Sequence, residues 1–491
     1  MIQIALVSQI LISLCFLAVV VLLFTNKLNR AIASITAAII TYFVLVFSEG
    51  KGFDIIVKLL FGSTEDNFVN LHSLILIVGM MFIVQISDEA GLFQFLGVLA
   101  IKITKGRPLA LMSVLCTLSV FFSALINNLL TVMILIPLTI TISRILNIDP
   151  TPYIITEAVM VNIGGTFFSI SSIPNILIVT ASLKTDTPIS FNQFFVNVGL
   201  FSLLVAGVTI GFFIFLYRQE LKEPRKRMVS TLEEFNPWNF VQNRILLFAS
   251  IGSLVVLIVL LVAINSPTIT PDIIALSIAM ILTIFSTFFG IKPGDIMKKF
   301  DIELLLYLLG IFVVAGGLEE VKIIDAIGNA LSNIGSSNPA FQAIVIIWIS
   351  AFLSSLIDNI PITKVLIPVV GIMSQGSNMA FYGLSFGANW GDNLTPLGDN
   401  VLVLNIAEQN NRPVKIKTFW KIGFTTTILQ LILVTLYFTF FSTQTYLIGL
   451  ITSIVLILIV GIVFIISKYG NEQVKSYVNK FINKFRTIVI G

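Results

Sequence analysis

The sequence Ser123-Ala-Leu-Ile-Asn-Asn128 interrupts an apolar run at 107–146, and Ser354-Ser-Leu-Ile-Asp-Asn359 interrupts a second run at 338–375. The two interruptions lie 231 residues apart. The same spacing aligns three further features: Pro137 with Pro368, Gly79 with Gly310, and Asp88-Glu89 with Glu319-Glu320. Four features at one spacing predict a duplication that gave the chain two similar halves.

Each interrupted run is too long for a single crossing, because about 20 apolar residues span a bilayer. The Asn and Asp side chains at the middle of each run need hydrogen-bond partners that lipid does not supply. We therefore expect each run to fold as a re-entrant helical hairpin with the polar pair at its tip. The alternative, two full spans joined by a tight turn, would place more of the basic loops outside the cell.

The composition indicates a membrane protein. Of the 491 residues, 57% are hydrophobic and 11% are charged, whereas a typical soluble protein has about 25% charged residues. The mean hydropathy is +1.02, and apolar runs of spanning length recur along the whole chain. We expect a multi-pass cell-membrane protein whose main partner is the bilayer, with no nucleic-acid partner and no cofactor. A nucleotide-binding loop is absent from the sequence.

The basic residues of the loops predict the topology, because Lys and Arg are enriched on the cytoplasmic side. They place the N-terminus outside and the C-terminus in the cytoplasm. If each hairpin enters and leaves at one face, each half crosses five times and the halves are inverted, which gives about 11 crossings. The predicted segments are a first transport repeat (1–217), a cytoplasmic linker (218–242), a second, inverted repeat (243–441), an extra transmembrane helix (442–467) and a basic amphipathic tail (468–491).

Two other apolar runs, 153–182 and 379–407, are rich in Gly, Pro and polar residues at their centres. Glycine lets a helix unwind, and proline removes a backbone donor. We expect each run to form a broken transmembrane helix whose break lies beside a hairpin tip. An all-α fold with inverted repeats, re-entrant hairpins and broken helices is typical of secondary transporters.

Ionisable residues at apparent membrane depth are concentrated in the second half. Charge at that depth is costly and usually functional. The four residues are Asp358, Lys364, Asp392 and Asp399, and the first-half positions that match three of them hold the neutral residues Asn127, Met133 and Gly165. The second site should therefore carry the charge, although Lys364 could instead form a structural bridge with one Asp. Glu157 is a weaker candidate, because it lies toward the cytoplasmic end of its run.

The predicted substrate- or ion-binding residues come from the two tips and the two breaks. They are Asn127, Asn128, Asn162, Gly164, Thr166, Asn175, Asp358, Asn359, Lys364, Asn389, Asp392, Asn393, Thr395, Asp399 and Asn400. Tip carbonyl and carboxylate oxygens suit a small dehydrated cation, so a Na⁺ site is predicted at the tip residues Asn127, Asn128, Asp358 and Asn359. The alternative is that the polar pairs only hold helices together.

These motifs resemble the ion-transporter superfamily, which includes arsenite permeases, D-type sodium/proton antiporters, the P protein, and citrate and dicarboxylate transporters. The resemblance covers about residues 70–430. The motifs most similar to the P-protein and arsenite-permease branch include Ser123-Ala-Leu-Ile-Asn-Asn128, Asn162-Ile-Gly-Gly-Thr166 and Asp358-Asn-Ile-Pro361. In that superfamily the tips and breaks form two ion sites beside one substrate site. By resemblance, the residues implicated are Asn127, Asn128, Asn162, Gly164, Asp358, Asn359, Asn393 and Thr395.

The sequence also departs from the superfamily. Neither tip carries the Ser-Asn-Thr motif of the dicarboxylate branch, and Ser171-Ser-Ile-Pro-Asn175 replaces the usual Gly-x-Pro-Pro-Asn. Asp392 stands where the second break usually has Gly. These departures argue against a citrate-like substrate and add negative charge at the centre.

The function expected is secondary active transport of a small ion or anion, coupled to Na⁺ or H⁺ by alternating access, and not enzymatic catalysis. The alternative is an arsenite-type or di/tricarboxylate anion transporter. Remoter alternatives are a channel and an intramembrane aspartyl protease, suggested by Gly391-Asp392 and Gly398-Asp399. The protease motif Gly-x-Gly-Asp is absent, because Pro396 takes the place of its first Gly. The sequence leaves open whether the protein is a symporter or an antiporter and whether it forms a homodimer.

Overall fold

The computed structural model describes residues 2–25, 28–64, 68–126, 128–185, 187–221, 236–264, 269–334, 338–373, 376–398 and 400–441, with several positions between 480 and 489. Two predicted site residues, Asn127 and Asp399, lie outside the described residues, as do the predicted helix at 442–467 and most of the tail. All regular elements within the described ranges are helical. Ten of these helices are long and apolar enough to cross a membrane. The predicted all-helical membrane class is therefore confirmed.

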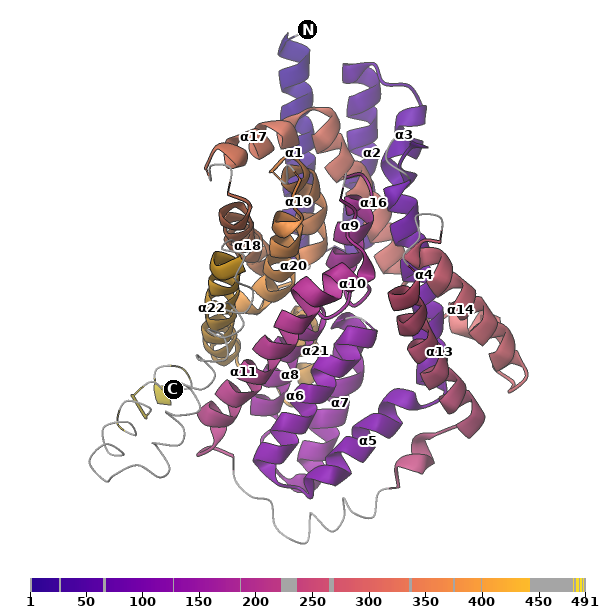
Figure 1. Ribbon diagram of the computed structural model, residues 1–491, viewed down its shortest axis with the longest axis vertical. Coiled ribbons are helices and arrows are strands. Elements are labelled where there is room, and N and C mark those ends of the chain that lie inside the picture. Colours follow the sequence, from indigo (N-terminus) through magenta and orange to yellow (C-terminus); the bar gives the residue numbers. More distant parts are fainter. Residues whose placement is uncertain are drawn as a thin grey trace.

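In the first half, the interrupted runs at 107–146 and 153–182 form the helix pairs α6–α7 and α8–α9. Figure 1 shows the arrangement of the helices, which include a short helix, α3, that was not predicted. The elements are α1 (Ile2–Thr25), α2 (Arg30–Glu49), α3 (Asp54–Phe61), α4 (Val69–Glu89), α5 (Leu92–Thr104), α6 (Pro108–Leu125), α7 (Asn128–Leu146), α8 (Thr151–Gly164), α9 (Ile173–Ser182), α10 (Phe191–Phe194), the π-helix η2 (Phe195–Gly199) and α11 (Leu200–Tyr217).

The second half begins with the 3₁₀ turn η3 (Pro237–Phe240) and repeats much of the same order of elements. The elements that follow are α13 (Arg244–Ala263), α14 (Pro271–Thr287), α15 (Pro293–Met297), α16 (Ile302–Glu320), α17 (Ile323–Ile334), α18 (Pro339–Leu356), α19 (Asn359–Met373), α20 (Met379–Gly391), the 3₁₀ turn η4 (Asp392–Leu394), α21 (Asn400–Gln409) and α22 (Ile416–Phe441).

Both interrupted runs fold as helical hairpins, α6–α7 and α18–α19. The first arm of each hairpin begins with a proline, Pro108 or Pro339, whose missing N–H is harmless in the first turn of a helix. The hairpins lie in opposite halves of the molecule, with α6–α7 below and α18–α19 above (Figure 1). This placement agrees with an inverted relation between the halves, which stays a prediction.

The halves exchange their outer helices. α2 of the first half packs on α16 of the second, and α14 of the second half packs on α4 of the first. The glycines matched by the 231-residue spacing lie at these contacts. A Cβ added to Gly79 would lie 3.0 Å from the backbone N of Leu276, and one added to Gly310 would lie 2.5 Å from the carbonyl C of Ser34. Small residues thus allow both helix pairs to approach closely.

The matched acidic pairs at the ends of α4 and α16 reinforce this exchange. Glu89 of the first half forms an ion pair with Lys299 of the second. Glu320 of the second half accepts from Lys51 at 2.7 Å and from Lys58 at 2.6 Å, and both lysines belong to the first half. The acidic residue at the end of α4 and the acidic residue at the end of α16 therefore each form ion pairs with lysines of the other half.

A prediction follows from the contact at Gly310. We expect Gly310→Val to lower the melting temperature of the detergent-solubilised protein by several degrees, because overpacking of a tight contact costs about 1–3 kcal/mol. Gly252→Val is the matched control, since a Cβ at Gly252 in α13 meets nothing within 4 Å. Thermal unfolding of the two variants side by side makes the test, and equal melting temperatures would contradict it.

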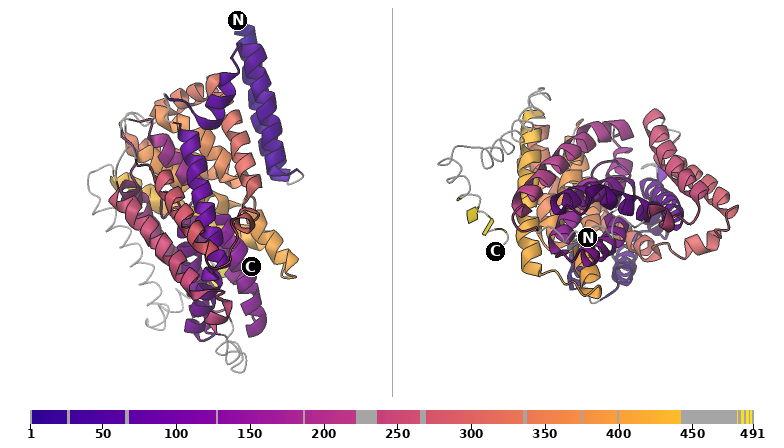
Figure 2. Two further views of the ribbon diagram at one scale, coloured as in Figure 1. Left: turned by 90° about the vertical axis from the view of Figure 1, so that its right-hand side faces the viewer. Right: turned by 90° about the horizontal axis from the view of Figure 1, so that it is seen from below.

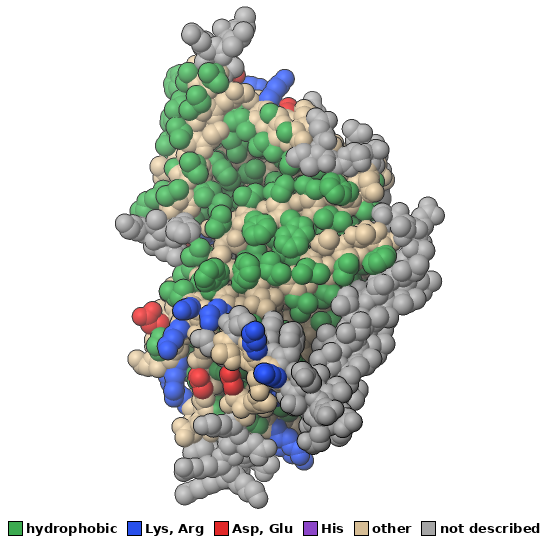
Figure 3. Space-filling view, turned by 90° about the vertical axis from the view of Figure 1, so that its left-hand side faces the viewer, with side chains coloured by type: hydrophobic (Ala, Val, Ile, Leu, Met, Phe, Trp, Pro, Cys, Tyr) green, Lys and Arg blue, Asp and Glu red, His purple; other side chains and the backbone are tan. Residues whose placement is uncertain are grey.

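The outer surface suits a lipid environment. α1 lies along one side of the molecule, against α2 and α16 (Figure 2). On one face, hydrophobic side chains cover the upper and middle parts, and the main group of charged side chains lies below them (Figure 3). Most of the described polar residues predicted for the site are instead buried inside the molecule, whereas Asp358, Lys364 and Thr395 are half-buried.

Candidate functional site

The first hairpin tip is hydrogen-bonded to the first break. Ser123 Oγ on α6 donates to Asn128 Oδ1 at 2.7 Å, and Asn128 Nδ2 donates to Asn162 Oδ1 on α8 at 2.9 Å. All three side chains are buried. Asn128 is the residue of the predicted polar pair that the structure describes. Its side chain bonds to Ser123 and Asn162, which both belong to the same half.

The second tip has the same arrangement, but a carboxylate is at its centre. Ser354 Oγ donates to Asp392 Oδ1, and Asn359 Nδ2 donates to Asp392 Oδ2 at 2.9 Å. Asp392 is 1% exposed. Its counterpart Gly165 has no side chain, and a Cβ there would lie 2.5 Å from Asn128 Oδ1. The amide of Asn128 thus fills, in the first half, the space that the carboxylate fills in the second.

The two breaks are bonded directly to each other. Asn162 Nδ2 donates to Asn393 Oδ1 at 2.8 Å, so Asn162 joins the first tip to the second break. On the other side, Asn389 Nδ2 donates to Asn175 Oδ1 at 3.0 Å. Trp390 Nε1 also donates to Thr166 Oγ1, at 3.1 Å. The residues predicted from the breaks therefore form one buried polar cluster at the interface of the halves.

Asn175 and Asn400 satisfy the carbonyl groups that each break leaves free. Asn175 Nδ2 donates to Gly165 O at 2.7 Å, and Asn400 Nδ2 donates to Asp392 O at 2.7 Å. Carbonyl groups at a helix end otherwise need a partner from outside the helix. These two amides therefore hold the unwound backbone in shape.

Glycines allow the hairpins to approach the broken helices. A Cβ on Gly164 would lie 2.5 Å from Val120 O on α6, and one on Gly391 would collide with Ala351 O on α18. Gly164, predicted as a binding residue, thus makes a backbone packing contact here. Thr395 Oγ1 similarly donates to Ser355 O at the end of the second hairpin's first arm.

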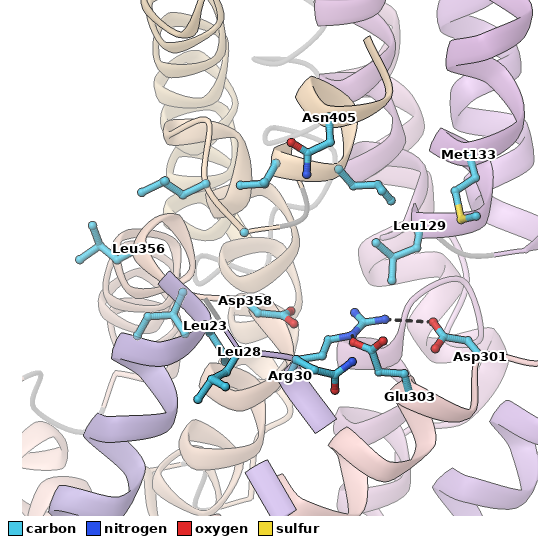
Figure 4. Close-up of a pocket in the computed structure, with 16 residues that line it drawn as sticks. Leu23, Leu28, Arg30, Leu129, Met133, Asp301, Glu303, Leu356, Asp358 and Asn405 are labelled. Atoms are coloured by element: carbon cyan, nitrogen blue, oxygen red, sulfur yellow. Dashed lines mark hydrogen bonds and ion pairs between the residues drawn. The ribbon is translucent and has the colours of Figure 1, made fainter. Parts of the chain in front are cut away.

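A cavity of ≈ 360 Å³ opens beside the second tip, and three carboxylates and one guanidinium group line it (Figure 4). Arg30 at the start of α2 donates to Asp301 Oδ2 at 3.0 Å and to Glu303 Oε1 at 3.1 Å. Asp358 of the tip points into the same space, toward Arg30. The excess of acidic groups gives this cavity a net negative formal charge.

Gly398 joins this cavity to the buried carboxylate. It lines the cavity and has a φ of +58°, in the left-handed region that favours glycine. A Cβ at Gly398 would lie 3.7 Å from Asp392 Oδ1 and 3.9 Å from Ile357 O. A carboxylate oxygen and a backbone carbonyl oxygen therefore face one small space at the second break, the kind of ligands that unwound helices offer to Na⁺.

Comparison with known proteins now identifies the family. The model of the citrate transporter family, CitMHS, matches residues 5–382. The chain belongs to the citrate transporter family. This family member is 25% identical to an uncharacterized transporter of Mycobacterium tuberculosis over 430 residues, which cover 86% of this chain and 96% of that protein. It is also 25% identical to the human P protein over 435 residues, which cover 73% of this chain and 52% of the P protein.

A solved structure is also similar to this family member. The Alcanivorax borkumensis YdaH transporter, described as having an unusual topology, matches with a TM-score of 0.49 and 15% sequence identity. The match covers 74% of this chain and 85% of that one. The predicted membership of the ion-transporter superfamily is confirmed by the family model and by the P protein relatives.

The structure separates some residues that the sequence grouped together. In this citrate transporter family member, Lys364 Nζ donates to Asn70 Oδ1 on α4 at 2.6 Å and lies 4.7 Å from the ring centroid of Phe312. The described residues of the predicted Na⁺ site also do not face one common space. Asn128 and Asn359 turn toward their own breaks, whereas Asp358 faces the cavity of Arg30.

Sequence reasoning missed several residues at this site. Arg30, Asp301 and Glu303 are not among the predicted site residues, yet all three line the cavity. Their signal in the sequence is weak, because each lies next to the end of an apolar run where charge is ordinary. Ser123 and Ser354 carry a clearer signal, since the repeated tip motif begins with both.

Proposed function

We propose that this protein is a secondary active transporter in which Na⁺ or H⁺ binds at the second tip and break and drives the movement of a small anion. The observation that carries the proposal is the buried carboxylate of Asp392, beside a cavity whose acidic groups outnumber its single Arg. The matched position in the first half is Gly165. Cation binding is therefore assigned to the second half.

A coupled cycle follows from the burial of this charge. An ionised carboxylate inside a protein is costly unless it is paired, and a bound cation supplies the pairing. Ser354 and Asn359 hold Asp392 by donating one hydrogen bond to each of its carboxylate oxygens, and a carboxylate oxygen can accept more than one bond. Cation binding would thus favour the state in which the two breaks lie closed against each other.

The anion is proposed from the family and from one side chain. The family description names citrate, so a di- or tricarboxylate is the first anion to test. Arg30, whose planar guanidinium group pairs well with carboxylates, lines the cavity that leads to the tip, and a carboxylate substrate would compete there with Asp301 and Glu303. Arsenite is the second candidate and enters as a separate arm of the experiment.

The experiment is a flux assay with the purified protein in proteoliposomes. Uptake of labelled citrate, succinate and arsenite is measured under an imposed Na⁺ gradient, an imposed pH gradient and no gradient. We expect accumulation of one anion only when one of the two gradients is present. Flux that is equal with and without gradients would indicate a channel and overturn the proposal. Accessibility of single cysteines added to the loops tests the proposed orientation, with the N-terminus outside.

Gly398 gives a prediction for the cation site. We expect Gly398→Ala to weaken the apparent affinity for the coupling cation at least tenfold, about 1.4 kcal/mol, because the new methyl group fills the space facing Asp392 Oδ1 and Ile357 O. The measurement is the cation dependence of uptake. Gly376→Ala is the matched control, since Gly376 also has a positive φ, +80°, but its added Cβ meets nothing within 4 Å. Equal affinities in the two variants would count against the site.

A further inference from the structure

A second buried carboxyl group lies in the first half, away from the acidic cavity. Glu157 on α8 is 0% exposed. Thr139 Oγ1 on α7 donates to Glu157 Oε1 at 2.5 Å. Glu157 Oε2 is buried and has no hydrogen-bond partner among the described residues. One oxygen of this carboxyl group is therefore held, and the other is left unsatisfied.

The surroundings of Glu157 do not compensate a negative charge. No Lys, Arg or His among the described residues forms an ion pair with it. The buried thiol of Cys116 on α6 lies near enough to Glu157 to interact with it electrostatically, and Tyr217 on α11 interacts in turn with that thiol. The other described elements that pack on α8 are α7, α20, α21, α22 and η4, and none of their charged groups, Asp392 of η4 included, acts on Glu157.

An ionised carboxylate in such a place would be very costly. Burial of an unpaired charge costs far more than burial of a neutral, hydrogen-bonded acid. The Glu157 carboxyl group therefore holds a proton in this conformation, carried on the unpartnered Oε2. The bond from Thr139 to Oε1 is compatible with the protonated acid, because its carbonyl oxygen still accepts.

The fold does not need a carboxyl group at this position. The second-half residue that corresponds to Glu157, at the spacing that matches Asn162 with Asn389, is Leu384. The residue that corresponds to Thr139 is Val370. Both are fully buried. In the second half, apolar side chains therefore occupy both matched positions. A helix pair of this kind can pack without the Thr139–Glu157 hydrogen bond.

Glu157 lies close to the polar cluster. The next residue of α8, Ala158, and the cluster residue Asn162 line a cavity of ≈ 10 Å³ together with Asn128 and Asn400. A space of that size holds about one water molecule. α21, which follows the second break, packs against both α7 and α8. Movement of the breaks relative to the first hairpin would therefore change the access of water to Glu157.

We propose that Glu157 is a proton-binding site of the transport cycle: it is protonated in the closed conformation seen here and releases its proton to water when α21 separates from α7 and α8. The step is a proton transfer, in which the Oε2–H bond breaks, a water molecule accepts the proton, and the carboxylate takes a proton back from water by the same route. This inference rests on the proposed function as a secondary transporter. It adds a proton site in the first half to the cation site in the second.

The first test reads the protonation of Glu157 without transport. Infrared difference spectra of the detergent-solubilised full-length protein, recorded across a pH titration, should contain the C=O band of a protonated carboxylic acid that Glu157→Gln removes. Thr139→Val, which removes the single donor, should shift that band and keep it. Asp272→Asn is the control, because Asp272 is also buried but bonds to His72 at 2.9 Å, and the band should survive in this variant. A wild-type spectrum without a band assigned to Glu157 would overturn the proposal.

The second test reads the transport role. We expect uptake of citrate, or of whichever tested anion the flux assay detects, to depend on pH in the wild type. Glu157→Gln should reduce the change in uptake across the tested pH range at least fivefold. Glu157→Asp, which keeps a carboxyl group, should restore much of that change. An unchanged pH profile in Glu157→Gln, with the infrared band gone, would reduce Glu157 to a structural acid and overturn its role in transport. If the wild type transports none of the anions, the proposed function fails, while the infrared titration still decides whether Glu157 binds a proton.

Discussion

Replacement of Asp392 by Asn is expected to reduce the rate of cation-driven uptake at least 100-fold. This factor corresponds to an increase of about 2.7 kcal/mol in the activation free energy of transport. The substitution preserves the shape of the side chain and removes the charge on which the proposed cation site depends. It also leaves one donor, from Ser354 or Asn359, facing an NH₂ group instead of an oxygen. An orphaned buried donor costs about 1–3 kcal/mol, so the melting temperature should fall as well. The measurement is initial uptake in proteoliposomes under Na⁺ and pH gradients.

Asp272→Asn is the matched control for this prediction too. Asp272 on α14 is 2% exposed and accepts from His72, far along the chain from either break. This variant should lose some thermal stability and keep its dependence on the coupling cation. If Asp392→Asn kept the same cation dependence as Asp272→Asn, the assignment of the cation to the second half would be wrong.

Replacement of Asn162 by Leu is expected to abolish transport and to lower stability more than any other single change in the cluster. Asn162 accepts from Asn128 and donates to Asn393, so leucine leaves the Asn128 donor unpaired and leaves Asn393 Oδ1 with only the long, 3.5 Å bond from Asn400, both in a buried site. Each unsatisfied group costs about 1–3 kcal/mol, which sums to about 2–6 kcal/mol. Thermal unfolding in detergent and uptake in proteoliposomes are the two measurements.

The control for Asn162→Leu is Asn410→Leu. The side chain of Asn410, directly after α21, donates to Ile406 O of that helix at 2.9 Å, so leucine there removes no partner from a side chain on another helix. We expect its melting temperature to stay within a degree or two of the wild type. A stable, active Asn162→Leu protein would show that the bond between the halves is incidental.

Much of the fold could be predicted from hydropathy and from the repeated tip motif. The positions of α6–α7 and α18–α19 follow from run length and from polar pairs that lipid cannot satisfy. The breaks after α8 and α20 follow from Gly, Pro and Asn inside apolar runs. These features are local, because each depends on residues within about 40 positions of one another.

The contacts between the halves could not be predicted in the same way. Nothing near Arg30 in the sequence indicates that it would meet Asp301 and Glu303, more than 270 residues later. The partner of Lys364 is likewise distant, since Asn70 belongs to the other half. Long-range pairing depends on how two helix sets dock, and a single sequence records that docking only where small residues such as Gly310 mark a close approach.

The exchange of helices between the halves has a consequence for biosynthesis. α2 is made early, but its partner α16 follows only after roughly 250 more residues, which takes about 12–50 s at ~5–20 residues per second. During that time the face of α2 around Ser34 lacks its native partner, although α1 can already pack on α2 and the first hairpin can already pack on α8. The exchanged helix pair therefore forms only when α16 enters the membrane, and a ribosome that stalls before that point leaves a first half with an uncovered helix face.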